Sequence, residues 1–447
     1  MTSIKAHVVV GAIPFVSHFT PMQTIARNLL TRGYSLTFVT GEVFREQVEQ
    51  TGARCVVPLG WEDLDDEWAK KSVAQRASKP FIENANINAM EFFIRPISTE
   101  FDAIQRVLAS SIVEHPTRPV VVLVESGFCG GLPLRLGAPG LQPKGVVTVG
   151  INPILALSID TAPPSQGILP DRSAGGRNRN ANLNKIFLEK MDPAQKELNR
   201  VLETLGARRT NLYRHNAIME LSTIFLQLCP PSLEYPRSDA PSTLRFTGGL
   251  PRSNSQSNKN PELPAWWDDI TLNPENRFVV AVSQGTVALD YNHLIIPTLE
   301  ALKERDDILV VAALGRKGAT LPGAIVNSHN ARIADWIPFD ELLSLSDVFV
   351  TNGGYGGFQN ALARGVPIVI AAPQFADKRD IADRVEWSET GINLRTGTPT
   401  SEALKEAVVK VLTEGTYKRR ALEIQTEIRS HNPMIIIAGA IDEVANL

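Results

Sequence analysis

Apolar runs alternate with amphipathic stretches through the first 150 residues of the chain. Residues 6–10 form an apolar, valine-rich run, residues 21–33 carry apolar side chains at helical spacing, and residues 34–40 return to a strand-like pattern. A strand, a helix and a second strand in this order are typical of a βαβ unit. Further apolar runs at 120–124 and 146–150 extend the predicted parallel sheet. The N-terminal part is therefore expected to fold as a doubly wound α/β domain.

A polar stretch separates this part from a second alternation. Residues 236–264 are crowded with proline, serine and asparagine, and nothing in 251–264 can supply a core. After them the apolar runs resume at 278–286 and recur up to a helical region that begins at residue 401. The predicted organisation is a first Rossmann-like domain at 1–240, a linker at 241–264, a second Rossmann-like domain at 265–425, and a C-terminal helix at 426–447 that packs back on the first domain.

The charge balance argues against nucleic acid and anionic membranes as partners. Lysine and arginine number 45 against 48 acidic residues, and no long run of a single sign occurs. The three cysteines, Cys55, Cys129 and Cys229, are scattered and form no C-x-x-C pair, so the sequence predicts neither a disulfide framework nor a zinc site. A small partner and a reducing, cytoplasmic setting are favoured.

The apolar N-terminal segment is interpreted as a strand rather than a signal peptide. His7, Pro14 and His18 interrupt it, and no small-residue cleavage pattern follows. No window approaches the roughly 20 apolar residues that a membrane-spanning helix needs. We expect a soluble monomer without a membrane span.

Four glycines lie among the five residues 353–357 (GGYGG), between an apolar run and a predicted helix. One glycine would be enough for a tight turn, whereas four suggest that a ligand approaches the backbone N–H groups at the start of the helix, where anions are favoured. Alone, the stretch fits a turn and a phosphate cradle equally well. Two α/β domains in tandem place a cleft between the carboxyl ends of their sheets, and this stretch is expected to face it.

Five short motifs follow one another in register around this stretch. They are Trp336-x-Pro338, Leu342-Leu343, Thr351 to Leu362, Gly365-Val366-Pro367, and the pair Pro373 and Asp377. Their order resembles the nucleotide-sugar signature of the family 1 UDP-glycosyltransferases, and the resemblance extends to VSQGT at 282–286 and to His18-x-x-Pro21. It implies the GT-B fold, in which two Rossmann-like doubly wound parallel-sheet domains face a central cleft. Such enzymes are usually inverting and metal-independent.

The resemblance implies a role for each donor-site motif of the second domain. Trp336 would offer a flat face to uracil, and the alternative is a buried core tryptophan. The glycines of 353–357 and the turn at 282–286 would hold the diphosphate on backbone N–H groups and a hydroxyl. Asn360 stands where the family has a ribose-binding glutamate, and Asp377 where it has a carboxylate that binds sugar hydroxyls. The predicted donor-binding residues are Gly285, Thr286, Trp336, Ile337, Asn352, Gly354, Tyr355, Gly356, Gly357, Asn360, Asp377 and Lys378.

Several positions depart from the family pattern. Asn352 replaces the usual histidine beside the β-phosphate, so stabilisation of the leaving group would rest more on backbone dipoles. Asn360 keeps the capacity to hydrogen-bond but lacks the charge of glutamate. Phe339 and Lys378 each stand where glutamine is usual. These departures bear on the base and the sugar rather than on the enzyme class.

A histidine and a glutamate of the first domain are the predicted catalytic pair. His18 is expected in a loop between the first strand and a helix opened by Pro21, and the resemblance gives it the role of general base. Glu125 ends the run VVVLVE, where the family has an acidic residue behind the base. A carboxylate that closes an apolar strand is costly without a partner, which favours a function. The alternatives are a surface or core histidine and a helix-capping or surface glutamate.

The first domain also offers a candidate wall for an acceptor pocket. Met90, Phe92 and Phe93 are its predicted residues, although the same spacing suits plain core. The acidic pair Asp63 and Asp65 lies in loop-like sequence, and a solvated loop is the simpler interpretation. We therefore expect no metal site.

These observations predict a glycosyltransferase that moves glucose from UDP-glucose to a hydroxyl of a small apolar or phenolic acceptor with inversion. His18 would remove the acceptor proton, Glu125 would stabilise the charged imidazole, and the glycine turns would stabilise the departing UDP. The UDP-sugar is a co-substrate, and no separate cofactor is expected. Two alternatives stay open. One is a nucleotide-sugar epimerase of the same fold, which would have no use for an apolar acceptor pocket, and the other is a non-catalytic nucleotide-sugar-binding protein.

Overall fold

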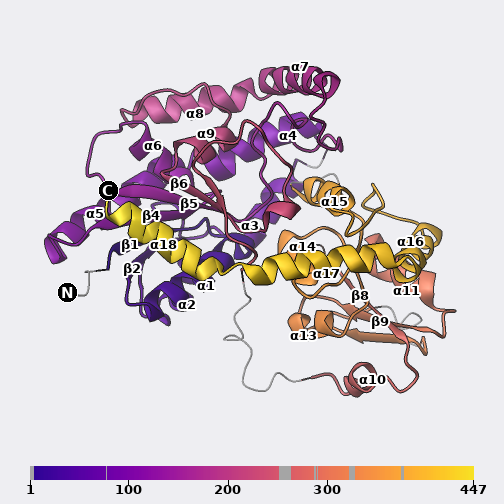
Figure 1. Ribbon diagram of the computed structural model, residues 1–447. Coiled ribbons are helices and arrows are strands. Elements are labelled where there is room, and N and C mark those ends of the chain that lie inside the picture. The colour runs from indigo at the N-terminus through magenta and orange to yellow at the C-terminus, as the bar shows by residue number, and fades with distance from the viewer. Residues whose placement is uncertain are drawn as a thin grey trace.

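The chain folds into two α/β domains that lie side by side (Figure 1). The first runs from indigo to magenta in the figure and the second is mainly orange, and each is built on one parallel sheet. The predicted fold class is therefore confirmed. The structure, a computed structural model, describes residues 5–76, 78–250, 263–285, 288, 290–321, 328–373 and 377–447.

The first sheet has seven strands in the described part of the chain. Their order across the sheet is β3 (Arg54–Val56), β2 (Ser35–Val39), β1 (His7–Gly11), β4 (Val120–Glu125), β5 (Gly145–Gly150), β6 (Ile224–Gln227) and β7 (Leu244–Phe246). All neighbouring strands pair in parallel. β4 and β5 are buried along their whole length, as expected for central strands that helices cover on both faces.

The position of β7 corrects the predicted linker. The sequence analysis assigns 241–264 to the linker, but residues 244–246 pair in parallel with β6. Three strand residues among proline and serine are too few to produce a visible alternation, so tertiary pairing decides their conformation. Residues 251–262 of the predicted linker lie outside the described residues.

The second sheet has six strands in the described part of the chain, and they too are parallel. The central strands β8 and β9 carry continuous apolar runs that are almost wholly buried. The order across the sheet is β10 (Ala331–Ala334), β9 (Ile308–Ala313), β8 (Phe278–Ser283), β11 (Val348–Thr351), β12 (Ile368–Ile370) and β13 (Gly391–Asn393).

Helices cover both faces of the first sheet, and alternate strand residues meet different helices. Val122 packs in one buried cluster with Ile104 of α5, whereas Val121 packs in another with Ile25 of α1. The elements are α1 (Val16–Thr31), η1 (Glu42–Phe44), α2 (Arg45–Glu49), α3 (Asp66–Ala74), α4 (Phe81–Asn88), the π-helical turn η2 (Ala89–Ile94), α5 (Ile97–Glu114), η3 (Cys129–Gly131), α6 (Leu132–Arg135), α7 (Ala174–Lys190), α8 (Asp192–Thr204), α9 (Arg214–Leu221) and η4 (Pro231–Leu233).

The start of α1 differs from the expectation. The helix begins at Val16 rather than at Pro21, so His18 lies in its first turn and not in a loop. Proline lacks an N–H group and usually interrupts a helix, which is why the sequence suggested a start at that residue. The helix continues through Pro21. Because proline has no N–H group, one carbonyl in the first turn of the helix lacks its usual backbone hydrogen bond.

The second sheet is covered in the same way. Phe358 of α14 and Ile381 of α15 pack on one face, and Leu299 of α11 and Val408 of α16 pack on the other. The elements are α10 (Asp268–Thr271), η5 (Tyr291–His293), α11 (Ile295–Leu302), α13 (Phe339–Ser344), α14 (Tyr355–Ala363), α15 (Lys378–Trp387), α16 (Ser401–Thr413), α17 (Gly415–Ser430) and α18 (Pro433–Ala445).

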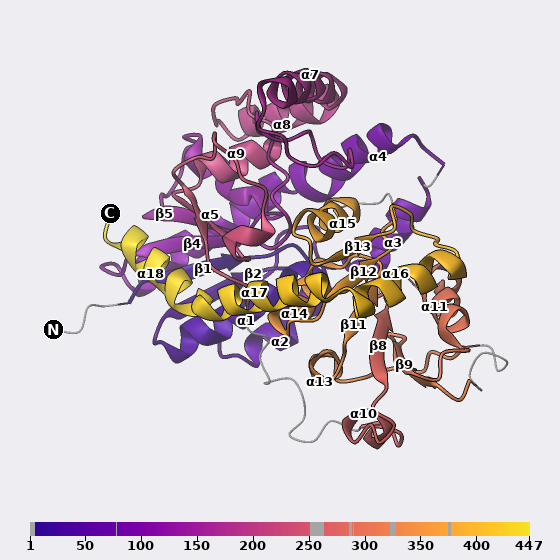
Figure 2. The same cartoon turned by 45° about the vertical axis from the view of Figure 1, so that its right-hand side comes forward.

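The last two helices connect the domains. α17 packs on the second domain through Ile424, and α18 packs on the first-domain sheet through Ile437 and Ile441 (Figures 1 and 2). Lys5 and Asp442 form an ion pair of 2.6 Å that ties α18 to the start of the chain. The returning segment starts at residue 433, where Pro433 opens α18, rather than at residue 426, which still belongs to α17.

A buried ion pair joins the domains beside the cleft. Arg384 of α15 donates to Glu234 Oε2 at 2.7 Å and to the carbonyl of Ile154 at 3.0 Å, both in the first domain. Arg384 and Glu234 each have a side-chain exposure of 1 %. Near the start of the same helix, Asp380 accepts from the backbone N–H of Ser165 at 2.9 Å. These contacts hold α15 against the first domain (Figure 2). Lys378, the first residue of α15, lines the cleft between the domains.

Candidate active site

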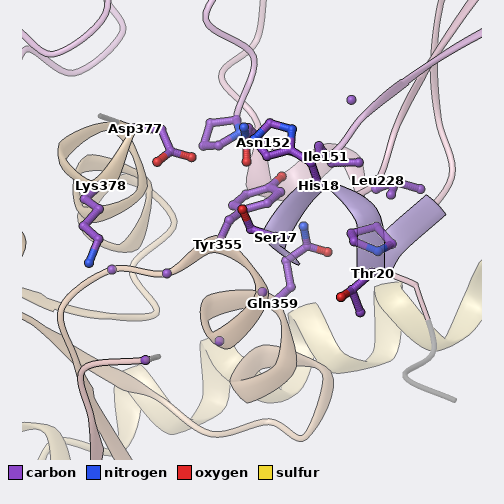
Figure 3. Close-up of a pocket in the computed structure, with 18 of the residues that line it drawn as sticks. Ser17, His18, Thr20, Ile151, Asn152, Leu228, Tyr355, Gln359, Asp377 and Lys378 are labelled. Carbon is purple, nitrogen blue, oxygen red and sulfur yellow. The ribbon is translucent and has the colours of Figure 1, made fainter. Parts of the chain in front are cut away.

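A large cleft of about 2460 Å³ lies between the domains and contains residues from both. Figure 3 shows Ser17 and His18 of α1 on one side of it, and Asp377 and Lys378 at the start of α15 on the other. The strand ends of both sheets supply the turns that line the cleft, as expected for parallel α/β domains. The two predicted halves of the site therefore face one shared space.

The structure brings His18 and Glu125 together. His18 Nδ1 lies 3.0 Å from Glu125 Oε2, and their side-chain exposures are 12 % and 0 %. β1 and β4 are neighbours in the sheet, so the first turn of α1 and the last residue of β4 meet at the same edge. The contact is within ion-pair distance, although the direction of the ring N–H falls short of full hydrogen-bond geometry.

Backbone N–H groups hold the Glu125 carboxylate. Oε1 accepts from Ile13 N at 3.2 Å, and Oε2 accepts from Gly127 N. Burial lowers the pKa of the His18 imidazole, but the Glu125 carboxylate, with smaller contributions from Asp377 and Asp66, raises it, and the pKa lies above its ordinary value. Glu125 thus favours the protonated imidazole, which is the form that a general base reaches after it takes a proton.

Gly127 is a support that the sequence analysis missed. A Cβ on this residue would lie 3.0 Å from both Glu125 carboxylate oxygens and 3.1 Å from His18 Cε1. A side chain at this position would therefore crowd both Glu125 and His18. A single glycine two residues after a candidate carboxylate gives only a weak signal in the sequence, because glycine is common in such turns.

Glu100 is a second buried carboxyl group behind the pair. Its side chain is fully buried on α5, and its pKa is raised well above the ordinary value by burial and by Glu125. Gly130 lies against it, since a Cβ there would come within 2.5 Å of Glu100 Cβ. A glutamate on the apolar face of an amphipathic helix was a signal in the sequence that could have identified this residue.

On the donor side, the glycine stretch forms the turn from β11 to α14. Gly353 has a φ of +91° and therefore needs to be glycine, whereas Gly354 has an ordinary φ of −73° and caps the helix. A Cβ on Gly354 would meet no protein atom within 4 Å. Gly356 and Gly357 lie in the first turn of α14 and line the cleft with them.

The second predicted turn faces the same space. Gly285 follows β8 with a φ of +73° and lines the cleft, and a Cβ there would meet no protein atom within 4 Å. Asn352, the last residue before the glycines, is buried and lines the same cleft. Thr286 was predicted to assist here, but it lies outside the described residues.

Trp336 has the exposure that a stacking platform needs. It is 53 % exposed and lines the cleft, which excludes the alternative of a core tryptophan. Its neighbour Ile337 is 4 % exposed and packs in the core beneath, so its side chain is turned toward the protein interior.

Two predicted donor-site side chains are occupied by protein partners. Asn360 is 5 % exposed, and its Nδ2 donates to Asp340 Oδ1 at 2.7 Å. Tyr355 is 8 % exposed, and its hydroxyl accepts from Gln227 Nε2 of β6 at 3.2 Å across the domain boundary. The backbone of Tyr355 still contributes to the start of α14. Sequence reasoning missed Asp340, because an acidic residue in the first turn of a short helix is ordinary.

Asp377 and Lys378 face the cleft from the N-terminus of α15 (Figure 3). Burial, together with Asp380, raises the pKa of Asp377, and burial lowers the pKa of Lys378 to about 8. The amide of Asn152, oriented with its nitrogen toward the carboxylate, lies 3.3 Å from Asp377 Oδ2. This contact joins the two domains at the edge of the site.

The predicted acceptor wall is only partly in place. Phe92 and Phe93 line the cleft, and Phe92 lies edge-to-face with Phe15, which in turn lies 6.2 Å from the His18 ring. Met90 is not among the lining residues and packs against the first-domain core. Side chains two positions apart on a helical turn point to different sides, so Met90 and Phe92 do not share one wall.

The described residues contain neither a metal-binding cluster nor a membrane-spanning helix. No group of three or more histidine, cysteine or acidic side chains is arranged to hold a metal ion within that part of the chain. No helix among the same residues is long and apolar enough to cross a membrane.

Comparison with known proteins decides the family. UDP-glucosyltransferase B1 of Starmerella bombicola is 36% identical over 445 residues, which cover 99% of each chain. The chain belongs to the UDP-glycosyltransferases. UDP-glycosyltransferase 2 of Phaeomoniella chlamydospora is also 36% identical, over 99% of this chain and 97% of its own. Residues 297–443 of this UDP-glycosyltransferase match the family "Erythromycin biosynthesis protein CIII-like, C-terminal domain".

The solved structures agree on the fold. The glycosyltransferase of kitacinnamycin matches this UDP-glycosyltransferase with a TM-score of 0.68 at 21% identity, over 98% of this chain and 99% of its own. The calicheamicin glycosyltransferase CalG4 matches with a TM-score of 0.64 at 18% identity, over 99% and 98% of the chains. These likenesses show that the UDP-glycosyltransferase has the GT-B fold. Its full-length relatives show that it is a UDP-dependent glycosyltransferase.

Proposed function

We propose that this enzyme transfers glucose from UDP-glucose to a hydroxyl of a small apolar or phenolic acceptor with inversion at the anomeric carbon. The observation that carries the proposal is the buried His18–Glu125 pair at the cleft, opposite the glycine turn and Trp336. The names of relatives such as UDP-glucosyltransferase B1 support glucose as the sugar. The aromatic wall at Phe92 and Phe93 supports an apolar acceptor.

The reaction needs one base and one stabilised leaving group. The acceptor oxygen attacks the anomeric carbon, its proton moves to the ring nitrogen of His18 that Glu125 does not face, and the bond to the β-phosphate oxygen breaks with its electron pair on UDP. Glu125 stabilises the imidazolium that results. Attack from the face opposite UDP inverts the anomeric carbon.

The donor is assigned to the second domain. Uracil stacks on exposed Trp336, backbone N–H groups at Gly354 and the following turn bind the diphosphate, and Asp377 with Lys378 binds the sugar. Asn360 belongs to the ribose region, as its place on α14 suggests. Asn352 and the helix N-terminus assist the departing phosphate, and no metal is part of the mechanism.

Setting and assembly are part of the same proposal. All three cysteines are buried and unpaired, which fits a reducing, cytoplasmic setting. Both sides of the cleft come from one chain, so a monomer contains every residue that the mechanism uses.

The test is a transfer assay with defined substrates. Purified enzyme, UDP-glucose and 4-nitrophenol should release UDP only when the phenol is present, and the product should gain the mass of one hexose. Because UDP-glucose is an α-glycoside, inversion should give a β-glucoside, which the anomeric proton coupling in NMR identifies. Conversion of UDP-glucose to another UDP-hexose without acceptor would favour the epimerase. Binding of UDP without turnover over a broad panel of phenols and sterols would favour a non-catalytic binding protein.

A further inference from the structure

A carboxylate of the second domain lies between the two ends of the proposed nucleotide site. Asp340 lines the cleft from the first turn of α13, four residues after Trp336. α13 packs against α14, whose N-terminus carries the glycine turn. In a nucleoside diphosphate the ribose joins the base to the phosphates. A base on Trp336 and phosphates at α14 therefore place the ribose beside α13.

Two side chains of α14 hold Asp340 in position. Asn360 Nδ2 donates to Asp340 Oδ1 at 2.7 Å, and Arg364 Nη2 lies 3.4 Å from Oδ2. Arg364 Nε also donates to the backbone carbonyl of Asp340 at 2.8 Å. Arg364 Nη1 donates to Asn360 Oδ1, so both ends of the Asn360 amide are already used within the protein.

Exposure separates the two candidate ribose-binding groups. The Asp340 side chain is 24 % exposed, whereas Asn360 is only 5 % exposed. A ligand in the cleft can therefore reach the carboxylate more readily than the amide behind it. Arg364 supplies the positive charge that makes a partly buried carboxylate tolerable.

We propose that Asp340, held by Asn360 and Arg364, is the group that binds the ribose hydroxyls of the donor, and that Asn360 acts on the ribose only through Asp340. An ionised carboxylate is purely an acceptor, and the 2′- and 3′-hydroxyls of ribose can both donate to it. The site then distinguishes a ribonucleotide from a 2′-deoxyribonucleotide, which lacks one of these donors. This inference rests on the proposed function, since it presupposes a UDP-sugar donor.

The test compares UDP with 2′-deoxy-UDP by titration calorimetry. The native enzyme should bind UDP about 10- to 100-fold more tightly than 2′-deoxy-UDP, the range typical of a hydrogen bond to a charged group. Asp340→Asn should weaken UDP binding by a similar factor and bring the two affinities to within about threefold. Moving the charge back in the double variant Asp340→Asn/Asn360→Asp should restore part of the preference for UDP.

Glu341→Gln is the matched control, since it removes the same charge from the neighbouring residue of α13. It should leave the ratio of the two affinities unchanged. An unchanged ratio in Asp340→Asn, with native UDP affinity, would overturn the role of Asp340 while leaving the transferase proposal intact. Failure of the native enzyme to bind UDP at all would overturn both. If Asp340→Asn lowers the affinities for UDP and 2′-deoxy-UDP by the same factor, Asp340 supports the structure of α13 and does not bind the ribose. That result would also refute the inference.

Discussion

A single imidazole carries the proposed proton transfer, and its surroundings set its pKa. Burial alone would lower the pKa of His18, and the negative charges around it, chiefly Glu125 and to a smaller extent Asp377 and Asp66, raise it above its ordinary value. A base works only when it is neutral, so activity should fall as pH drops through the raised pKa of this residue. Glu125 therefore stabilises the imidazolium that forms when His18 takes a proton. The same effect keeps His18 protonated, and so inactive as a base, in mildly acidic solution.

The pH profile of kcat/KM tests this arrangement. In the native enzyme the acid limb should lie above the ordinary histidine value of about 6.5. Glu125→Gln removes the largest of the charges that raise the pKa of His18, so the limb should move to lower pH, with a slower plateau. A limb that stays in place in this variant would show that another group controls it.

Removal of the base itself should be the larger loss. His18→Ala is expected to lower kcat by about 10²- to 10⁴-fold, and less for an acidic phenol than for an aliphatic alcohol, because the phenol is partly ionised already. The losses of His18→Ala and Glu125→Gln should overlap in the double variant, since the two residues act as one unit. UDP affinity, measured by calorimetry, should stay native because the donor site lies on the other domain. Full activity on both acceptors in His18→Ala would remove the residue from the mechanism.

At the scale of elements, the glycines in the turn from β11 to α14 have different roles. The sequence predicts a single phosphate cradle for the glycines of 353–357. In the structure, Gly353 has a positive φ and its Cβ position is crowded by Ile370 and Lys378, at 3.2 and 3.3 Å. Gly354 has an ordinary φ and open space around it. The first glycine thus serves the fold, and the second leaves room in the cleft.

Two alanine variants should separate these duties. Gly353→Ala is expected to destabilise the protein by about 1–3 kcal/mol, because alanine must adopt a strained backbone conformation in a crowded place. Gly354→Ala should leave the melting temperature within a few degrees of the native value but weaken UDP binding by about tenfold or more, because its methyl group enters the proposed phosphate space. Calorimetry and thermal melts measure both quantities. Native UDP affinity in Gly354→Ala would show that phosphate does not approach this residue.

The ends of the buried strands were the features that could be predicted best from the sequence. Buried parallel strands carry long apolar runs, so β4 and β11 could be recognised, and with them Glu125 and the glycine turn. Features set by contacts between elements could not be recognised. The three-residue strand β7 and the partnership of Asp340 with Asn360 both depend on neighbours that are distant in the sequence.

At the scale of the whole molecule, two C-terminal elements connect the second domain to the first. α18 returns to the first domain, and α15 reaches across the cleft through Arg384. The sequence predicted the return of a C-terminal helix. It did not predict the ion pair of Arg384 and Glu234 at the contact between the domains, which we call the seam. Arg384 and Glu234 lie 150 residues apart in the sequence, and nothing in either local pattern links them.

The buried pair of Arg384 and Glu234 should matter much more to stability than an exposed ion pair that also involves a residue of α15. Arg384→Met leaves Glu234 buried with Arg237 as a more distant partner, at 3.4 Å, so we expect a loss of about 3–5 kcal/mol or somewhat less. Arg395→Met is the control, because its 2.7 Å pair with Glu386 is largely exposed and should be worth under about 1 kcal/mol. The triple variant Arg384→Met/Glu234→Met/Arg237→Met should recover much of the loss, because no charge of this cluster then stays buried without its partner. Urea unfolding followed by tryptophan fluorescence compares the four proteins. If Arg384→Met unfolds at the same urea concentration as Arg395→Met, the seam is held by its apolar contacts and not by this ion pair.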